Sequence, residues 1–135
     1  MAATIALCLF TLATVHFYWG LCCIDGRPML VPELDGKPAY KPRNSDYLDV
    51  ASALVLACVI VAARGEVVHS PMPVAWTNTA TFAVGAVLIA RAIGDFRFVG
   101  FFKRVHDTRF AEWDTRLFSP VSLLLGVATL WVAVH

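Results

Sequence analysis

The chain has 135 residues and a net charge of +1, and 59% of its residues are hydrophobic, with a mean hydropathy of +0.68. Soluble domains contain roughly 45–50% apolar residues, and a chain of this size lacks the polar shell needed to bury the excess. The composition therefore excludes an ordinary soluble protein, and the length predicts one domain over residues 1–135. The net charge says nothing about nucleic acid, and no basic run is long enough to suggest it, so nucleic acid is not expected as a partner.

The apolar residues fall in four blocks, at about residues 2–24, 47–63, 74–93 and 118–134. A hydrocarbon core about 30 Å thick is crossed by roughly 17–25 helical residues, so each block is long enough to span it. The predicted fold class is all-α, a four-helix transmembrane bundle. We expect the first block to stay as a membrane helix rather than be cleaved, because no Lys or Arg precedes it and no small-residue cleavage site ends it.

Basic and aromatic residues predict how these spans are oriented. Four spans place the long connectors 25–46 and 94–117 on one side, opposite both termini and the short connector 64–73. The long connectors carry nine basic residues, Arg27, Lys37, Lys41, Arg43, Arg97, Lys103, Arg104, Arg109 and Arg116, whereas the other side has only Arg64. The positive-inside rule then puts the long connectors in the cytoplasm and both termini outside. Aromatic anchors mark the same two levels, with Trp19, Tyr47 and Trp113 at one and Trp76 and Trp131 at the other.

The first long connector is rich in residues that disfavour helix. Pro28, Pro32, Pro38 and Pro42 each remove a backbone donor and restrict the preceding residue. Asp35-Gly36 is a preferred pair for a tight hairpin turn. We expect a short hairpin-like loop over this end of the bundle, since the connector is longer than a plain link requires.

The second long connector has helical periodicity. Its apolar residues recur at i, i+3, i+4 and i+7, as Phe98, Phe101, Phe102 and Val105. This pattern predicts an amphipathic helix lying in the membrane interface. After a break near Asp107-Thr108 the pattern continues, and Ser119-Pro120 supplies a helix cap and a first-turn proline for the last span.

Polar residues near the long-connector end of the spans are candidate ligand-binding residues, because ionisable groups at membrane depth are costly and tend to be functional. They are His16, Tyr18, Trp19, Asp49, Arg91, Asp95, Arg97, Lys103, Arg104 and Asp114. One interpretation is a structural lattice, in which Arg91 pairs with Asp95 or Asp49 while His16 bonds Tyr47 or a backbone carbonyl. The other is a pocket open to the interface, with His16 at its floor, Arg91 and Asp95 in its walls, and a histidine that titrates near neutrality.

Neither metal nor any other cofactor is expected. The four histidines, His16, His69, His106 and His135, show no metal-type spacing, and only His16 lies deep in a span, whereas haem between two spans needs two ligands at matching depth. No phosphate loop or nucleophile elbow occurs. The cysteines Cys8, Cys22, Cys23 and Cys58 lack redox or zinc spacing, which favours inert buried thiols.

The segment from Arg91 to Pro120, RAIGDFRFVGFFKRVHDTRFAEWDTRLFSP, resembles the hallmark segment of a family of small four-span membrane proteins, domain of unknown function 3995. The end of the first block, His16-Phe-Tyr-Trp19, and the Val31-Pro32…Gly36-Lys-Pro38 connector are similar too. Cys22-Cys23 stand where the family tends to have paired glycines. The resemblance implies the four-span fold and, from its bacterial members, a cytoplasmic-membrane location. It implies no reaction.

Three functions fit these features. The first is binding of, or catalysis on, an amphipathic molecule such as a lipid, sterol-like or isoprenoid compound, in an apolar bundle with one polar end. The second is a proton-coupled transporter acting as a homodimer, although no ionisable residue continues the path toward the termini. The third is a structural or regulatory subunit whose basic connectors dock a partner or anionic lipid headgroups. The sequence favours the first and leaves open whether the protein is an enzyme.

Overall fold

The computed structural model describes residues 1–22, 31–34, 37–39 and 42–135. Within them lie four long helices, α1 (Ala2–Leu21), α2 (Asn44–Arg64), α3 (Val74–Ile93) and α5 (Ser119–Val134). The short helix α4 (Arg109–Trp113) and one π-helical turn, η1 (Asp114–Phe118), run into α5, so the last helical span is Arg109–Val134. All four spans are long and apolar enough to cross a membrane, which confirms the predicted all-α, four-helix class.

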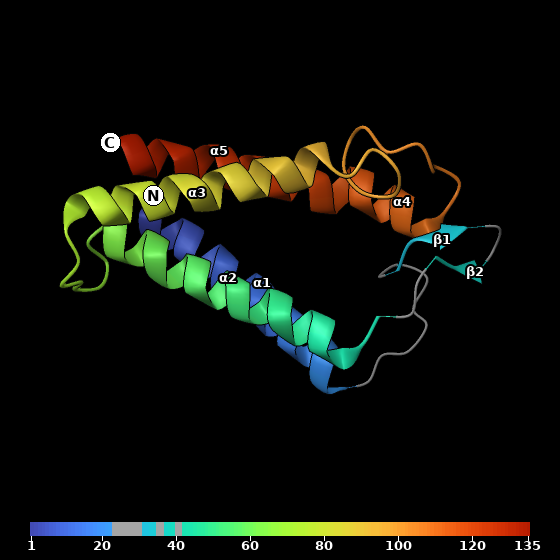
Figure 1. Cartoon of the computed structure of the whole chain (residues 1–135), viewed down its shortest axis with the longest axis horizontal. Coiled ribbons are helices and arrows are strands. Elements are labelled where there is room, and N and C mark those ends of the chain that lie inside the picture. The colour runs from blue at the N-terminus through green and yellow to red at the C-terminus, as the bar shows by residue number, and fades with distance from the viewer. Residues whose placement is uncertain (23–30, 35–36, 40–41) are drawn as a thin grey trace.

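The bundle is built from two helix pairs. The helix α1 packs along α2, and α3 packs along α5, whereas contacts between the pairs are fewer. The pairs lie close together near both chain termini and separate toward the end where α1 and α3 finish and α2 begins, here named the connector end (Figure 1). The buried core residues that join the pairs come from α1, α2 and α5: Ile5, Leu9, Ala57, Val61, Leu125 and Val132.

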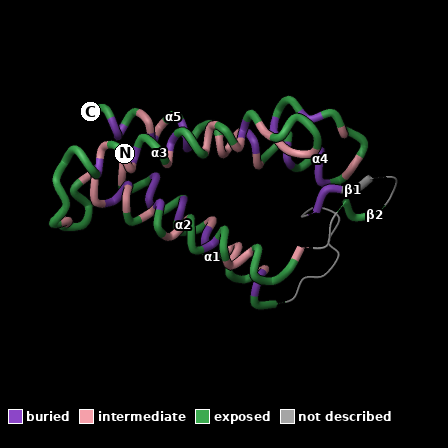
Figure 2. Tube along the Cα trace, viewed as in Figure 1, coloured by how far each residue is buried: buried purple, intermediate pink, exposed green. Residues whose placement is uncertain are grey.

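Exposed residues run along all four spans, as Figure 2 shows, and many of them are large and apolar. Large side chains such as Leu7, Leu56, Val87 and Leu124 are each more than 60% exposed. Such a continuous apolar surface is unstable against water but is solvated by lipid chains. The protein is therefore an integral membrane protein with four spans.

Small residues allow α3 and α5 to approach closely. A Cβ placed on Gly126 would lie 2.7 Å from Cγ1 of Ile89 and 3.0 Å from the carbonyl oxygen of Gly85. Helix pairs in membranes associate through such close packing, because lipid supplies no hydrophobic drive between them. The α3–α5 pair is thus fixed near its middle.

The observed span boundaries differ from the predicted ones in the second and fourth spans. The helix α1 ends at Leu21, and the predicted end at residue 24 lies outside the described residues, as does Cys23. The helix α2 begins at Asn44 rather than residue 47, because the backbone N–H of Arg43 donates to the Asp46 carboxylate at 2.9 Å and caps the first turn. The third span, Val74–Ile93, agrees with its prediction, whereas the fourth begins at Arg109 instead of residue 118.

The predicted hairpin is present in the first connector. Strands β1 (Glu33–Leu34) and β2 (Lys37–Pro38) pair antiparallel, with Leu34 opposite Lys37. The N–H of Ala39 continues the pairing by donating to the Pro32 carbonyl at 2.7 Å. The turn residues Asp35-Gly36 lie outside the described residues. Figure 1 places the hairpin at the connector end.

The predicted amphipathic helix over Phe98–Val105 is wrong, because residues 94–108 form a loop that folds back on α3. The N–H groups of Phe101 and Phe102 donate to the carbonyls of Ala92 and Ile93, at 2.8 and 3.4 Å. A helix leaves its last carbonyls without partners, so these bonds compete with helix formation in the loop. The loop can fold back on α3 because Gly94 has a φ of 93° and lies against the backbone of Val99.

Candidate functional site

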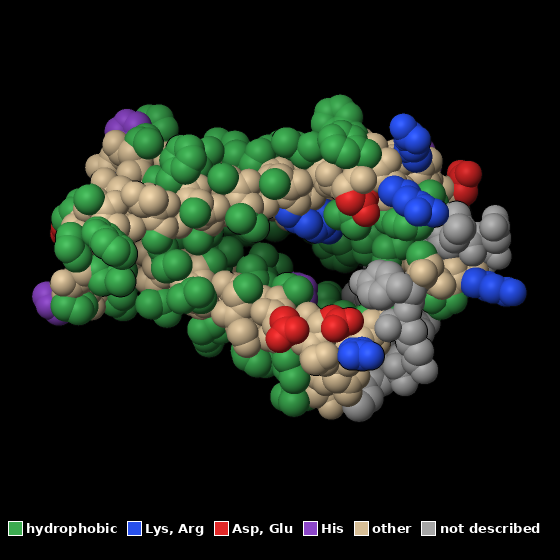
Figure 3. All heavy atoms as spheres, in the orientation of Figure 1, with side chains coloured by type: hydrophobic (Ala, Val, Ile, Leu, Met, Phe, Trp, Pro, Cys, Tyr) green, Lys and Arg blue, Asp and Glu red, His purple; other side chains and the backbone are tan. Residues whose placement is uncertain are grey.

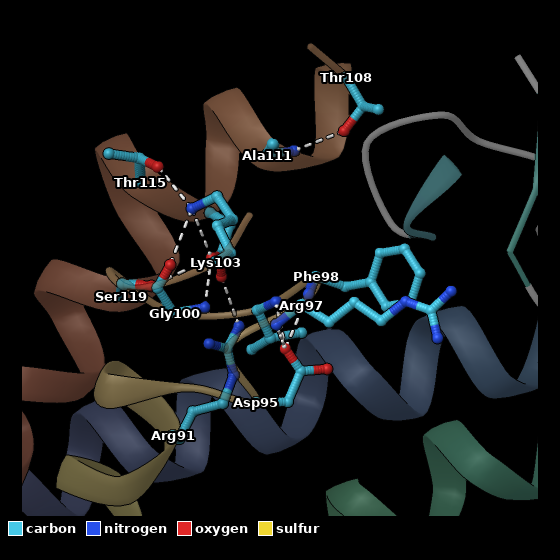
Figure 4. A network of polar contacts seen from close by, with 12 residues as sticks. Arg91, Asp95, Arg97, Phe98, Gly100, Lys103, Thr108, Ala111, Thr115 and Ser119 are labelled. Atoms are coloured by element: carbon cyan, nitrogen blue, oxygen red, sulfur yellow. Dashed lines mark hydrogen bonds and ion pairs between the residues drawn. The ribbon is translucent and has the colours of Figure 1, made fainter. Parts of the chain in front are cut away.

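The carboxylate of Asp114 is fully buried and is the centre of a polar cluster (Figure 4). Its Oδ1 accepts a hydrogen bond from Nη2 of Arg91 at 2.7 Å. Its Oδ2 accepts from three donors, the Lys103 ammonium at 3.0 Å, the backbone N–H of Gly100 at 2.8 Å and the Ser119 hydroxyl at 3.2 Å. Together with Thr115, these residues are called the Asp114 cluster below.

The Lys103 side chain is also buried, and its three ammonium protons all have acceptors. Besides Asp114, they bond the Gly100 carbonyl at 2.9 Å and the Thr115 hydroxyl at 2.6 Å. A buried charge is tolerated only when it is paired and fully hydrogen-bonded. Lys103 therefore ties the second connector to the start of the last span.

The Arg91 guanidinium uses only some of its hydrogen-bond donors within the protein. The Arg91 side chain is 34% exposed, and its Nη1 is buried without a partner among the described residues. A guanidinium has five N–H donors, of which the bond to Asp114 takes one. Because two cations, Arg91 and Lys103, share one carboxylate, the cluster carries a surplus positive charge.

The π-helical turn η1 brings Asp114 and Ser119 together. The backbone N–H of Ser119 donates to the Asp114 carbonyl five residues earlier, and its hydroxyl donates to the Asp114 carboxylate. Such single turns are rare and frequently occur at functional sites. On the exposed side of the same helix, Glu112 and Arg116 form an ion pair of 2.6 Å.

Asp95 organises the loop that follows α3. Its Oδ1 accepts hydrogen bonds from the backbone N–H groups of Arg97, Phe98 and Val99 at 2.7–2.9 Å. Partial burial raises the pKa of this carboxyl, but the three backbone donors outweigh it and hold the pKa below its ordinary value. The Arg97 guanidinium lies 4.9 Å from the Phe98 ring centroid. The backbone carbonyl of Arg97 accepts a hydrogen bond from the N–H of Arg104. Both arginine side chains are exposed.

His16 lies on the other helix pair, half-buried on the face of α1 that also carries Ala13 and Gly20. Its Nδ1 lies 2.8 Å from the Leu12 carbonyl, so the ring N–H donates to backbone. Its ring centroid is 5.0 Å from that of Trp19. The aromatic row continues to α2, since the Trp19 and Tyr47 rings are 6.3 Å apart.

A hollow separates the two helix pairs on the connector side (Figure 3). Lys or Arg side chains border it where the upper pair faces the lower one, Asp or Glu side chains lie beside them and on the lower pair, and apolar side chains form much of its walls. Arg91 lies two residues before the end of α3, at this level of the bundle. A molecule entering this hollow from the membrane would meet apolar walls first and charged groups at the connector end.

The comparison with protein families decides what kind of chain this is. The family described as "Protein of unknown function (DUF3995)" matches residues 9–129. The chain belongs to the DUF3995 family. No curated protein and no solved structure matches it. The resemblance noted in the sequence is thereby confirmed, and the DUF3995 match includes every residue of the Asp114 cluster.

The structure of this DUF3995 chain groups the predicted site residues unequally. It brings Arg91, Lys103 and Asp114 into one cluster, with the Asp95 loop beside them (Figure 4). The other predicted residues lie on the α1–α2 pair: His16, Tyr18, Trp19 and Asp49, of which Tyr18 and Asp49 are exposed. A pocket shared by His16 and Arg91 stays a prediction. Across the described residues, no three His, Cys, Asp or Glu side chains are arranged to hold a metal ion.

The expected partner of Arg91 was wrong. Arg91 pairs with Asp114, rather than with Asp95 or Asp49, and Oδ1 of Asp95 accepts three backbone donors. For His16, the expected bond to a backbone carbonyl is confirmed at Leu12.

Sequence reasoning missed three members of the Asp114 cluster, Gly100, Thr115 and Ser119. Ser119 was interpreted as a helix cap, but the helix begins at Arg109, so its hydroxyl is free to bond Asp114. Gly100 has a φ of 88°, and its position inside a phenylalanine-rich run was the signal for a turn. Nothing in the sequence singles out Thr115.

Proposed function

We propose that this DUF3995 protein binds an amphipathic, lipid-like molecule. The apolar part of that molecule lies between the α1–α2 and α3–α5 pairs, and its polar part lies at the connector end. The observation that carries the proposal is the hollow between the pairs (Figure 3), bordered by charged side chains at one end only. An opening of this kind within a bilayer is filled by apolar chains, whereas its polar end selects a headgroup.

The location that goes with this proposal is a bacterial cytoplasmic membrane. We place both long connectors in the cytoplasm and both termini outside, because Lys and Arg concentrate in the connectors. Binding would then take place at the cytoplasmic leaflet. The membrane lipid itself is the most available partner for such a site.

Native mass spectrometry of the protein purified in mild detergent tests the proposal. We expect the wild-type protein to retain a lipid-like ligand and His16→Ala to reduce its occupancy severalfold, because His16 lies half-buried on the inner face of α1. His69→Ala is the matched control, since His69 is exposed in the short connector at the other end. Equal occupancy in all three folded proteins would contradict a binding site at this end.

A second candidate is proton-coupled transport by a homodimer. It is favoured by two hydroxyls in the other half of the bundle, those of Thr81 and Thr129, which are fully buried without partners among the described residues. Buried hydroxyls of this kind can hold water and extend a polar path. Proton flux into liposomes that is unchanged in Thr81→Val and His16→Ala would eliminate this candidate.

A further inference from the structure

The donors and acceptors of the Asp114 cluster are nearly all used within the protein. Both carboxylate oxygens of Asp114 have donors, and the ammonium group of Lys103 has three acceptors. Arg91 is the exception, because its side chain is one-third exposed and gives Asp114 one of its five N–H donors, while its Nη1 is buried without a partner among the described residues. Any further ligand of this cluster would therefore bind at Arg91.

The backbone around Arg91 does not supply the missing acceptor. The carbonyls of Ala90, Ala92 and Ile93, at the end of α3, already accept the N–H groups of Gly94, Phe101 and Phe102. Lysine or arginine side chains near a helix end often bond such carbonyls when they are free. Here these carbonyls already have backbone donors, so no bond to them is seen for the Arg91 guanidinium among the described residues.

The charge at this position favours an anion over a neutral group. Arg91 and Lys103 together exceed the single charge of Asp114, and Arg97 and Arg104 are exposed on the same loop. Asp95, on the same loop, has one oxygen turned toward three backbone donors of that loop. A planar guanidinium matches the oxygens of phosphate with two parallel hydrogen bonds.

The depth of Arg91 fits a lipid phosphate. It lies one turn or less from the end of α3, where a spanning helix reaches the headgroup region. A phosphate held there would leave acyl chains directed toward the apolar walls of the hollow (Figure 3).

We infer that the site recognises a phosphate anion through the free donors of Arg91, either as a lipid headgroup or as free phosphate. This inference rests on the proposed function, because it names the polar group of the amphipathic ligand. The Asp114 cluster positions the guanidinium, and the surplus charge of the cluster is neutralised when the anion binds.

Competition between two lipids in native mass spectrometry tests this inference. Phosphatidic acid and diacylglycerol, which has identical chains but no phosphate, are offered at equal concentration to wild type, Arg91→Lys, Arg91→Gln and Arg116→Gln. We expect the wild-type protein to prefer phosphatidic acid by about tenfold, the size of one charge-assisted hydrogen bond. The preference should shrink in Arg91→Lys and disappear in Arg91→Gln.

Two of these variants act as controls. Arg116→Gln removes one positive charge from the same side of the molecule but lies outside the cluster, so it should keep the wild-type preference. Arg91→Lys keeps a cation beside Asp114 and so tests recognition even if Arg91→Gln fails to fold. Inorganic phosphate is added in a separate arm, and displacement of phosphatidic acid at millimolar concentration would support the anion site and assign it to free phosphate.

The outcomes separate this inference from the function on which it rests. Retention of both lipids without preference, or a preference that both Arg91 variants keep, would overturn the phosphate site and leave amphipathic binding in place. A wild-type protein that retains neither lipid and binds no phosphate would overturn both.

Discussion

Replacing Asp114 with Asn should strongly destabilise the protein. The substitution keeps the shape of the side chain but removes the negative charge that pairs with buried Lys103. The new amide group would also point N–H donors at the donors that now bond the carboxylate, from Arg91, Gly100 and Ser119. Breaking a buried ion pair on one side costs about 3–5 kcal/mol.

Reversible unfolding in mixed micelles, by titration with sodium dodecyl sulfate, measures this loss. The matched control is Glu112→Gln, which breaks the ion pair with Arg116 on the exposed side of the same helix. Because both of its partners are more than half exposed, that change should cost less than about 1 kcal/mol.

A second substitution separates lost charge pairing from lost shape. Adding Lys103→Met to Asp114→Asn removes the orphaned buried cation, and it should recover part of the lost stability. The reasoning is refuted if Asp114→Asn costs no more than Glu112→Gln, or if Lys103→Met makes the double variant still less stable.

Three further predictions follow from the fold. Gly126→Leu should cost about 1–3 kcal/mol in the same titration, because a Cβ there meets Ile89 at 2.7 Å; wild-type stability would show that α3 and α5 are not in close contact. Because the pKa of Asp95 is lowered in the folded protein, its carboxylate stabilises the loop at pH values above the ordinary Asp pKa of about 3.9. This stabilisation is lost as the pH falls through the native pKa. Amide exchange at residues 97–99 should therefore quicken below about pH 4 relative to Asp95→Asn, and equal profiles would contradict this role. Single cysteines at Ser70 and His106 should react with membrane-impermeant maleimide from outside and from the cytoplasm, respectively, and the reverse pattern would invert the topology.

The spans were predictable because their physical cause is local. A predominantly apolar stretch of twenty residues is sufficient to define the third span, and its predicted bounds of 74–93 agree with α3. The α2 boundary needed one capping contact, from Arg43 to Asp46, which composition does not contain. The family resemblance was also carried by contiguous residues, and the match over residues 9–129 confirms it.

The candidate site was less predictable because its contacts are distant in sequence. Arg91 and Asp114 are 23 residues apart, and no spacing rule joins them across an irregular loop. The Phe98–Val105 periodicity favoured a helix, but the free carbonyls at the end of α3 and the Asp95 carboxylate took the backbone donors of that segment. Both errors have one origin, since the loop bonds to the end of α3 rather than to itself.

An experimental density map of the protein in lipid nanodiscs tests the central claim most directly. The claim is that an amphipathic molecule lies between the two helix pairs with its polar end at Arg91. The map should show the pairs separated at the connector end, with an elongated density between them that reaches the Arg91 guanidinium. Closed pairs, with α1 packed against α3 along their whole length and no such density, would contradict it.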